Sequence, residues 1–162
     1  MIQRIQTIYL LVATVLMAMT LMMPLATFSY EGKDIVLSAF GLKGIPAEIG
    51  TVNTQIFYYL IALLILPTLL PIVIIFLFKK RMLQIRLCVS EILLLLGSLG
   101  FIGIFCWRFY DVIKTDVVKN GELIFTLEWS AIMPIIAIIL VGLAIRGIAK
   151  DEALVRSLDR IR

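Results

Sequence analysis

The pattern of hydrophobic and polar positions divides the chain into four long apolar runs separated by short charged segments. A helix rises ~1.5 Å per residue and the hydrocarbon layer of a bilayer is ~30 Å thick, so each run is long enough to cross a membrane. The pattern predicts an all-α membrane protein, a bundle of four transmembrane helices. We expect the helices at about residues 5–27, 55–78, 87–107 and 129–148.

Composition supports a membrane protein with one integral membrane domain over residues 1–162. Hydrophobic residues make up 62% of the chain and charged residues 16%, with a mean hydropathy of +1.08. Soluble domains have about 45–50% apolar and about 25% charged residues. The charged residues also gather between the runs and at the two ends, as expected for segments outside the bilayer.

The distribution of cations predicts the orientation. Of the 15 lysines and arginines, ten lie at the two ends of the chain or between the second and third runs, and five lie in the other two connections. Cytoplasmic segments carry the excess of Lys and Arg. We therefore expect cytoplasmic N and C termini and outer loops at 28–54 and 108–128. The tight cluster Lys79-Lys80-Arg81 is the strongest single indication.

The two outer loops carry β-strand patterns. Residues 34–40 are rich in β-branched and aromatic types, and Asn120-Gly121 separates the arms 116–119 and 122–127. Asn-Gly between such arms is a strong hairpin signal. If the first loop also forms a hairpin, around residues 31–33, the two pair into a small extracytoplasmic β-hairpin cap; the alternative is two independent loops. The topology resembles that of claudins, but the cysteine pair and Trp signature of the claudin outer loop are missing, so the resemblance is architectural.

A stripe of small residues marks the outer half of the third run. Gly97, Gly100 and Gly103 would let another helix approach closely. Such a face serves either a partner protein or second copy, or packing against helices of the same chain. The second interpretation is favoured here, because a four-helix bundle already needs close helix contacts.

Glu91 is the one charged residue well inside an apolar run. A carboxylate buried in a membrane costs several kcal/mol unless it is paired or protonated, and is therefore a candidate functional group. We expect an ion pair with Arg146 of the fourth helix, or contact with the basic loop. The alternative is a proton- or ion-linked site beside a kink at Pro67 and Pro71.

The residues needed for most catalytic and cofactor sites are missing. The chain has no histidine, and Cys88 and Cys106 lie about 27 Å apart along one helix. We expect no catalytic residues, no cofactor, no metal site and no nucleic-acid partner.

Residues 149–162 are predicted to form a cytoplasmic amphipathic tail. Leu154, Leu158 and Ile161 form an apolar stripe at helical spacing among basic residues. The tail would contact anionic lipid, together with the basic 79–86 loop, or dock a protein. The N-terminal residues 1–7 are expected beside it.

The sequences at the two ends of the chain resemble those of a known protein family. The segments MIQRIQTIYL (residues 1–10) and KDEALVRSLDR (residues 150–160) resemble those of a bacterial family of small four-helix membrane proteins classed as a domain of unknown function. The resemblance implies the bacterial inner membrane and transfers no activity. We expect a non-enzymatic accessory or scaffold subunit of a membrane assembly, in contact with lipid and with other membrane proteins or itself. The alternative is a small transporter or ion-conducting protein that uses Glu91.

Overall fold

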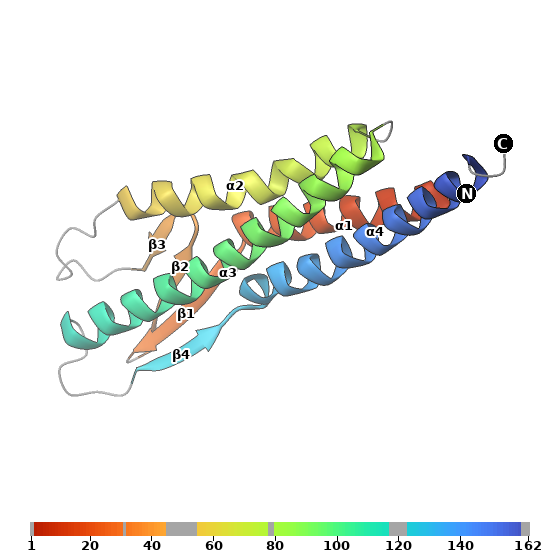
Figure 1. The fold of residues 1–162 in the computed structure, drawn as a ribbon. Coiled ribbons are helices and arrows are strands. Elements are labelled where there is room, and N and C mark those ends of the chain that lie inside the picture. Colours follow the sequence, from red (N-terminus) through yellow and green to blue (C-terminus); the bar gives the residue numbers. More distant parts are fainter. Residues whose placement is uncertain (1, 31, 45–54, 78–79, 117–122, 160–162) are drawn as a thin grey trace.

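The computed structural model describes residues 2–30, 32–44, 55–77, 80–116 and 123–159. Its four helices are α1 (Ile2–Met22), α2 (Gln55–Phe76), α3 (Arg81–Asp116) and α4 (Trp129–Asp159), and a small sheet completes the fold. Figure 1 shows the chain ends beside the α2–α3 connection and the sheet at the opposite end. We call these the termini end and the sheet end.

All four helices are long and apolar enough to cross a membrane, as the hydrophobic pattern predicts. Only 28–33% of each apolar span is buried inside the molecule. Most side chains of these spans are therefore partly or fully exposed. Lipid-facing surfaces of membrane bundles have this character, because acyl chains are as apolar as leucine.

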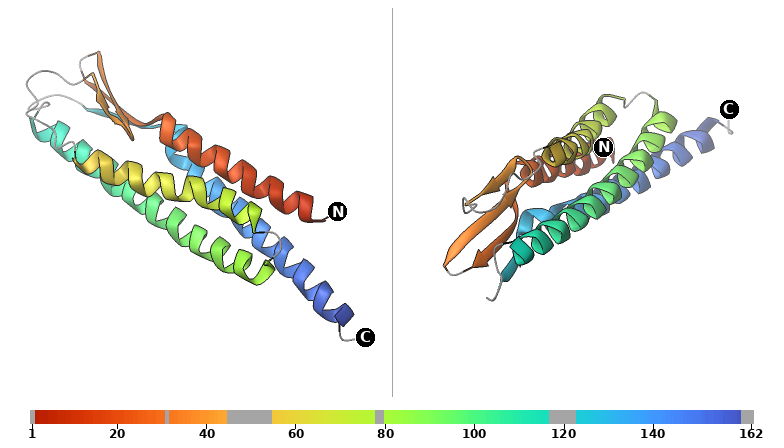
Figure 2. Two further views of the ribbon diagram at one scale, coloured as in Figure 1. Left: turned by 90° about the horizontal axis from the view of Figure 1, so that it is seen from above. Right: turned by 90° about the vertical axis from the view of Figure 1, so that its left-hand side faces the viewer.

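The helices pack in a closed ring. α1 lies between α2 and α4, and α3 completes the ring by contacting the same two helices (Figure 2). Each helix turns one stripe of buried residues inward. The largest fully buried side chains along these stripes are Phe105, Leu10, Met17, Leu60, Leu64, Ile74, Leu95 and Ile113.

Several helix boundaries differ from the sequence-based expectation, and those of α1 and α3 have a clear physical reason. The first helix ends at Met22 instead of continuing to residue 27, and the strand β1 (Pro24–Tyr30) follows. Pro24 has no N–H for the helix and disfavours helical backbone in the residue before it, so the helix stops there. The third helix is longer than expected, because residues 81–86 and 108–116 contain no Gly or Pro to end it. Its 36 residues span about 54 Å.

The sheet has four antiparallel strands in the order β3-β2-β1-β4. β2 (Lys33–Ser38) and β3 (Gly41–Lys43) follow β1, while β4 (Ile124–Leu127) comes from the connection between α3 and α4. The two outer loops therefore do build one sheet, as the strand patterns suggested. The turn between Tyr30 and Lys33 contains Gly32 at φ 76°, a backbone conformation that glycine adopts without strain.

The second predicted hairpin differs in its first arm. Asp116, expected to begin that arm, is the last residue of α3, and Asn120-Gly121 lies outside the described residues. β4 instead pairs with β1, with Ala26 opposite Leu127 and Thr27 opposite Thr126.

The outer end of α3 packs against the sheet through aromatic rings. The ring of Phe125 on β4 lies 5.4 Å from that of Phe28 on β1 and 6.2 Å from that of Tyr110 on α3, measured between centroids. On the α2 side, Phe57 contacts Phe105 and Phe109 at 5.4 and 5.6 Å. These contacts fix the α3 extension to both α2 and the sheet.

Candidate functional site

Glu91 lies on the side of α3 that faces the helix ring. Its side chain is 0% exposed, one turn from the buried Cys88 and one turn from the buried Leu95. Neither carboxyl oxygen has a hydrogen-bond partner among the residues that the structure describes. The expected pair with Arg146 does not form, because α4 turns the Arg146 side chain to its exposed face while α3 turns Glu91 inward.

The setting restricts what Glu91 can do chemically. An ionised carboxylate without a donor is costly in an apolar interior. A proton, or a partner group from outside the described residues, would remove that cost. No group of three or more His, Cys, Asp or Glu side chains that would hold a metal ion exists within the described ranges.

A second polar cluster lies at the termini end and joins three helices. The Gln6 side-chain amide of α1 donates a 2.9 Å hydrogen bond to Asp151 Oδ2 on α4, and the Arg81 guanidinium of α3 donates to the Asp151 backbone oxygen at 3.1 Å. Gly147 makes the α1–α4 contact possible, since a Cβ there would lie 2.9 Å from Gln6 Cγ. We call Gln6, Arg81, Gly147 and Asp151 the termini-end cluster.

The sequence indicated that the N-terminal residues lie beside the end of α4 but did not identify the termini-end cluster. The sequence did contain a signal for this cluster. Gln6 precedes Leu10 by four positions and Asp151 follows Ile148 by three, so each extends the buried stripe of its helix as a polar member. Two polar residues on facing apolar stripes are expected to pair, because each would otherwise be buried without a partner.

A third set of polar contacts joins the two helix–strand junctions at the sheet end. The Thr20 hydroxyl donates to the Ser130 carbonyl oxygen at 3.1 Å, and the Ser130 hydroxyl donates to the Pro24 carbonyl oxygen. The Glu128 backbone N–H donates to the Leu25 carbonyl oxygen at 3.1 Å. The α1–β1 junction is thereby held against the β4–α4 junction.

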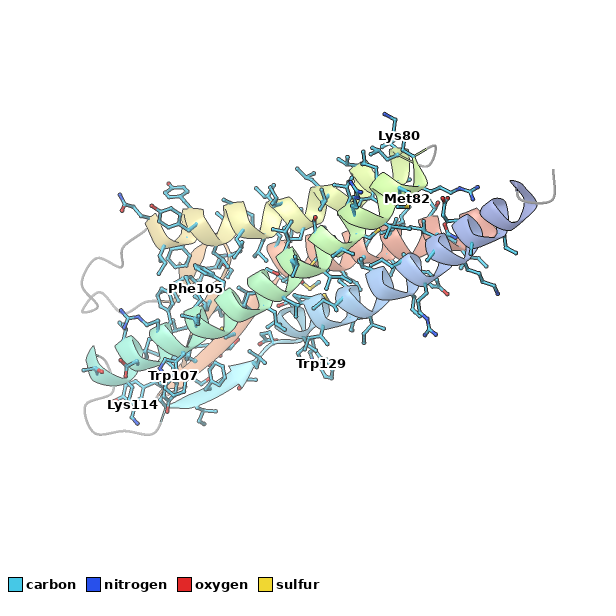
Figure 3. All side chains as sticks on the ribbon, in the orientation of Figure 1. Lys80, Met82, Phe105, Trp107, Lys114 and Trp129 are labelled. Atoms are coloured by element: carbon cyan, nitrogen blue, oxygen red, sulfur yellow. The ribbon has the colours of Figure 1, made fainter. Side chains whose placement is uncertain are left out.

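The glycine stripe of α3 faces away from the bundle. Gly97, Gly100 and Gly103 are all exposed, and a Cβ built on any of them meets no atom of the described residues within 4 Å. The expectation that they pack against helices of the same chain is therefore wrong. Exposed Leu93, Leu96, Ile104 and Trp107 flank the glycines at helical spacing. Together these seven residues form what we call the α3 outer face; Figure 3 shows Trp107 near its sheet-end limit.

The C-terminal segment is not a separate helix. α4 continues without interruption through Leu154 and Leu158 to Asp159, and Ile161 lies outside the described residues. Nothing between residues 146 and 152 breaks the helix, and the contacts of Asp151 hold this part against α1 and α3. The Leu154 side chain is 50% exposed. The expectation of a separate tail after residue 148 is therefore wrong, whereas its contact with lipid or with a protein stays a prediction.

These features define a class: a small bundle of four helices with membrane-spanning dimensions, capped at one end by an antiparallel sheet. The chain belongs to the family described as "Domain of unknown function (DUF4293)", whose match covers residues 2–161. A comparison with curated proteins gives no match.

Proposed function

We propose that this protein is a non-enzymatic accessory or scaffold subunit of a membrane protein assembly. The observation that carries the proposal is the unpartnered α3 outer face, in which Gly97, Gly100 and Gly103 lie in open space between large apolar residues. Without a hydrophobic driving force between helices in lipid, close packing at small residues is what brings membrane helices together.

The geometry of the α3 outer face suits a second helix. The glycines recur every three residues and the flanking Leu93, Leu96 and Ile104 supply side chains that interdigitate with a neighbour. A helix lying on the glycines would bring backbones close enough for Cα–H···O contacts. The helix that docks here belongs to another membrane protein or to a second copy of this chain.

The proposed setting is the inner membrane of a bacterial cell, with both termini in the cytoplasm and the sheet in the periplasm. The excess of Lys and Arg at the termini end supports this orientation. Exposed Tyr58, Tyr59 and Trp129 near the starts of α2 and α4 support a membrane–water interface at the sheet end, where such rings are enriched. The basic α2–α3 connection and the end of α4 then meet anionic lipid headgroups.

The test replaces Gly100 by isoleucine and compares the variant with Ala62→Ile. Ala62 is an exposed small residue on a different helix, α2. Gly100→Ile should abolish association, read as loss of co-purifying proteins and of energy transfer between labelled copies in vesicles. The thermal unfolding midpoint in detergent should not fall, because a Cβ at this exposed position has no atom of the described residues within 4 Å.

Ala62→Ile should leave the association intact. Association that survives Gly100→Ile, or that is lost equally in both variants, would exclude the α3 outer face as the docking surface.

A second function has its own supporting observation. The buried, unpartnered carboxyl of Glu91 suits a proton- or ion-linked transport step, and α2 brings Pro67 and Pro71, two interruptions of backbone hydrogen bonding, into the same bundle. Purified protein in liposomes would then give a proton or cation flux that Glu91→Gln removes. A flux that the substitution leaves unchanged would exclude Glu91 as the site.

A further inference from the structure

The β2–β3 turn lies at the same end of the sheet as the end of α1. β1 leaves α1 at Pro24 and β2 returns to this level, since Ser38 is opposite Pro24 and Gly41 is opposite Ser38. The turn residues Ala39 and Phe40 therefore sit beside the junction of α1 and β1.

The last residue of β4 reaches the same level. Leu127 is opposite Ala26, and Trp129 begins α4 two residues later. Figure 3 shows Trp129 at the start of α4, beside the end of β4. Three segments far apart in the sequence thus form one rim, which we call the sheet base: Met22, Met23, Phe40, Leu127 and Trp129.

The sheet base is apolar and exposed. Phe40 is 61% exposed, Met22 76% and Trp129 81%, and Met23 and Leu127 are exposed as well. Glu128 lies between Leu127 and Trp129 in the sequence. Its carboxylate accepts a hydrogen bond from the Thr27 hydroxyl at 2.8 Å. Five large apolar side chains at one level are not a surface suited to bulk water.

The length of α1 places this level at the edge of the hydrocarbon. The apolar span of α1, Ile5–Met22, has 18 residues and measures about 27 Å, slightly less than the ~30 Å hydrocarbon layer. The 22 residues of α2 measure about 33 Å, and Figure 1 shows the outer parts of α2 and α3 running beside the sheet. Lipid that covers the full length of α2 therefore extends past the end of α1 and reaches the sheet base.

We propose that the sheet base is a lipid-binding rim that anchors the sheet at the membrane–water interface. Phe40 and Trp129 insert their rings at the headgroup–acyl boundary, where amphipathic anchors of membrane proteins reside. The turn backbone stays at headgroup level, because hydrocarbon does not accept loops with unpaired amides. The Ser38 hydroxyl donates to the Gly41 carbonyl oxygen at 2.8 Å and so satisfies one polar group of the turn. The lipid contact of the four spans is thus continuous with that of the sheet.

This inference rests on the proposed membrane insertion, and the experiment separates the two. Nitroxide labels are placed singly at Phe40→Cys, Leu127→Cys, Lys33→Cys and Leu66→Cys in a chain carrying Cys88→Ala and Cys106→Ala. Lys33 marks the far turn of the sheet and Leu66 an exposed position within the α2 span. In phosphatidylethanolamine–phosphatidylglycerol vesicles, collision with oxygen reports lipid and collision with a soluble nickel chelate reports water.

The ratio of oxygen to nickel accessibility at positions 40 and 127 should be several-fold higher than at position 33 and close to that at position 66. If nickel accessibility at position 40 equals that at position 33 while position 66 is in contact with lipid, the lipid-binding rim is wrong. Membrane insertion of the helices would still hold in that case. Shielding of position 40 from both reagents would also overturn it, because protein and not lipid would then cover Phe40. A water-accessible position 66 would contradict membrane insertion itself, and the rim with it.

Discussion

Glu91 combines complete burial with an absence of hydrogen-bond partners in the part of the chain that the structure describes. A carboxyl group in this state has lost its contacts with water and gains no hydrogen bond in return. It therefore lowers the stability of the helix bundle relative to an apolar side chain of similar size. Local violations of this kind are expected mainly at functional or assembly sites, which makes Glu91 a candidate and not an established functional residue.

Replacing Glu91 by leucine should stabilise the isolated protein. Removing a buried unsatisfied polar group recovers about 1–3 kcal/mol in the free energy of unfolding, measured by thermal or SDS unfolding in detergent micelles. Glu91→Gln, which keeps a polar group without a partner, should change the free energy of unfolding much less. A clear loss of stability in Glu91→Leu would mean that the carboxyl group has a partner in the folded protein.

The sequence identified Glu91 but assigned it the wrong neighbour. Position along the chain places Glu91 and Arg146 at similar depth, yet pairing also requires the two side chains to face each other. The runs are apolar on all sides, so their periodicity carries little information about which face turns inward. For the same reason the sequence predicted that Gly97, Gly100 and Gly103 form a stripe on one helix, but not whether that stripe faces into or out of the bundle.

The helix pair α1 and α4 depends on a close approach at the termini end. Gly147 leaves room for the Gln6 side chain, which reaches Asp151 on the following turn of α4. Gly142, on the same helix, has no atom within 4 Å of a Cβ position and serves as a matched control.

Gly147→Ala and Gly142→Ala should have opposite effects on stability. Alanine is favoured over glycine in helices by about 0.5–1 kcal/mol, so Gly142→Ala should stabilise the protein by that amount. Gly147→Ala should lower the free energy of unfolding by about 1 kcal/mol, because the new methyl group displaces Gln6 from its hydrogen bond. Thermal unfolding in detergent measures both.

The combination with Gln6→Ala provides the control for this mechanism. In that background the displaced side chain is absent, and Gly147→Ala should become as favourable as Gly142→Ala. A persistent loss would show that the methyl group disturbs the α1–α4 backbones rather than Gln6.

Helix positions were predictable because hydrophobic length is a direct consequence of bilayer thickness. Helix ends were less so. Pro24 stopped α1 early even though the apolar run continues to residue 27, and no breaker stopped α3 where its apolar run ends at residue 107. Hydrophobicity therefore located the four helices, whereas backbone chemistry decided where α1 and α3 ended.

The molecule as a whole is organised around two antiparallel units, α1 with β1 and β4 with α4. The helices of these units pack along their length and their strands pair, so the sheet continues the α1–α4 contact beyond the helices (Figure 1). The strand patterns allowed one sheet or two independent loops. The β1–β4 pairing required knowledge that α1 and α4 are neighbours, which no local signal in the sequence provides.

A pair of engineered cysteines tests both the strand pairing and the orientation. Thr27 and Thr126 are directly opposed in antiparallel strands, at a Cα separation of about 4.5–5.5 Å that a disulfide can bridge. With Cys88 and Cys106 replaced by alanine, Thr27→Cys/Thr126→Cys should oxidise in cells if the sheet lies in the periplasm, since disulfides persist there. Gel mobility after alkylation, with and without reductant, measures the bond.

Thr27→Cys/Phe125→Cys is the matched control, because adjacent strand residues point to opposite faces. It should stay reduced. If the Thr27/Thr126 pair forms only after oxidation of purified protein, the pairing is right and the orientation is inverted; if it never forms, the β1–β4 register is wrong.

The pairing of β1 with β4 also dictates an order of biogenesis. Thr27 and its contact Glu128 are separated by 101 positions, so a ribosome that has finished β1 has yet to synthesise α2 and α3. During that interval one edge of β1 has no neighbouring strand to satisfy its amide groups. In the proposed orientation, a nascent polypeptide halted after Asp116 would expose this edge in the periplasm, where chaperones and proteases bind extended segments. Quality control of this protein is therefore expected to act chiefly before the last helix is inserted.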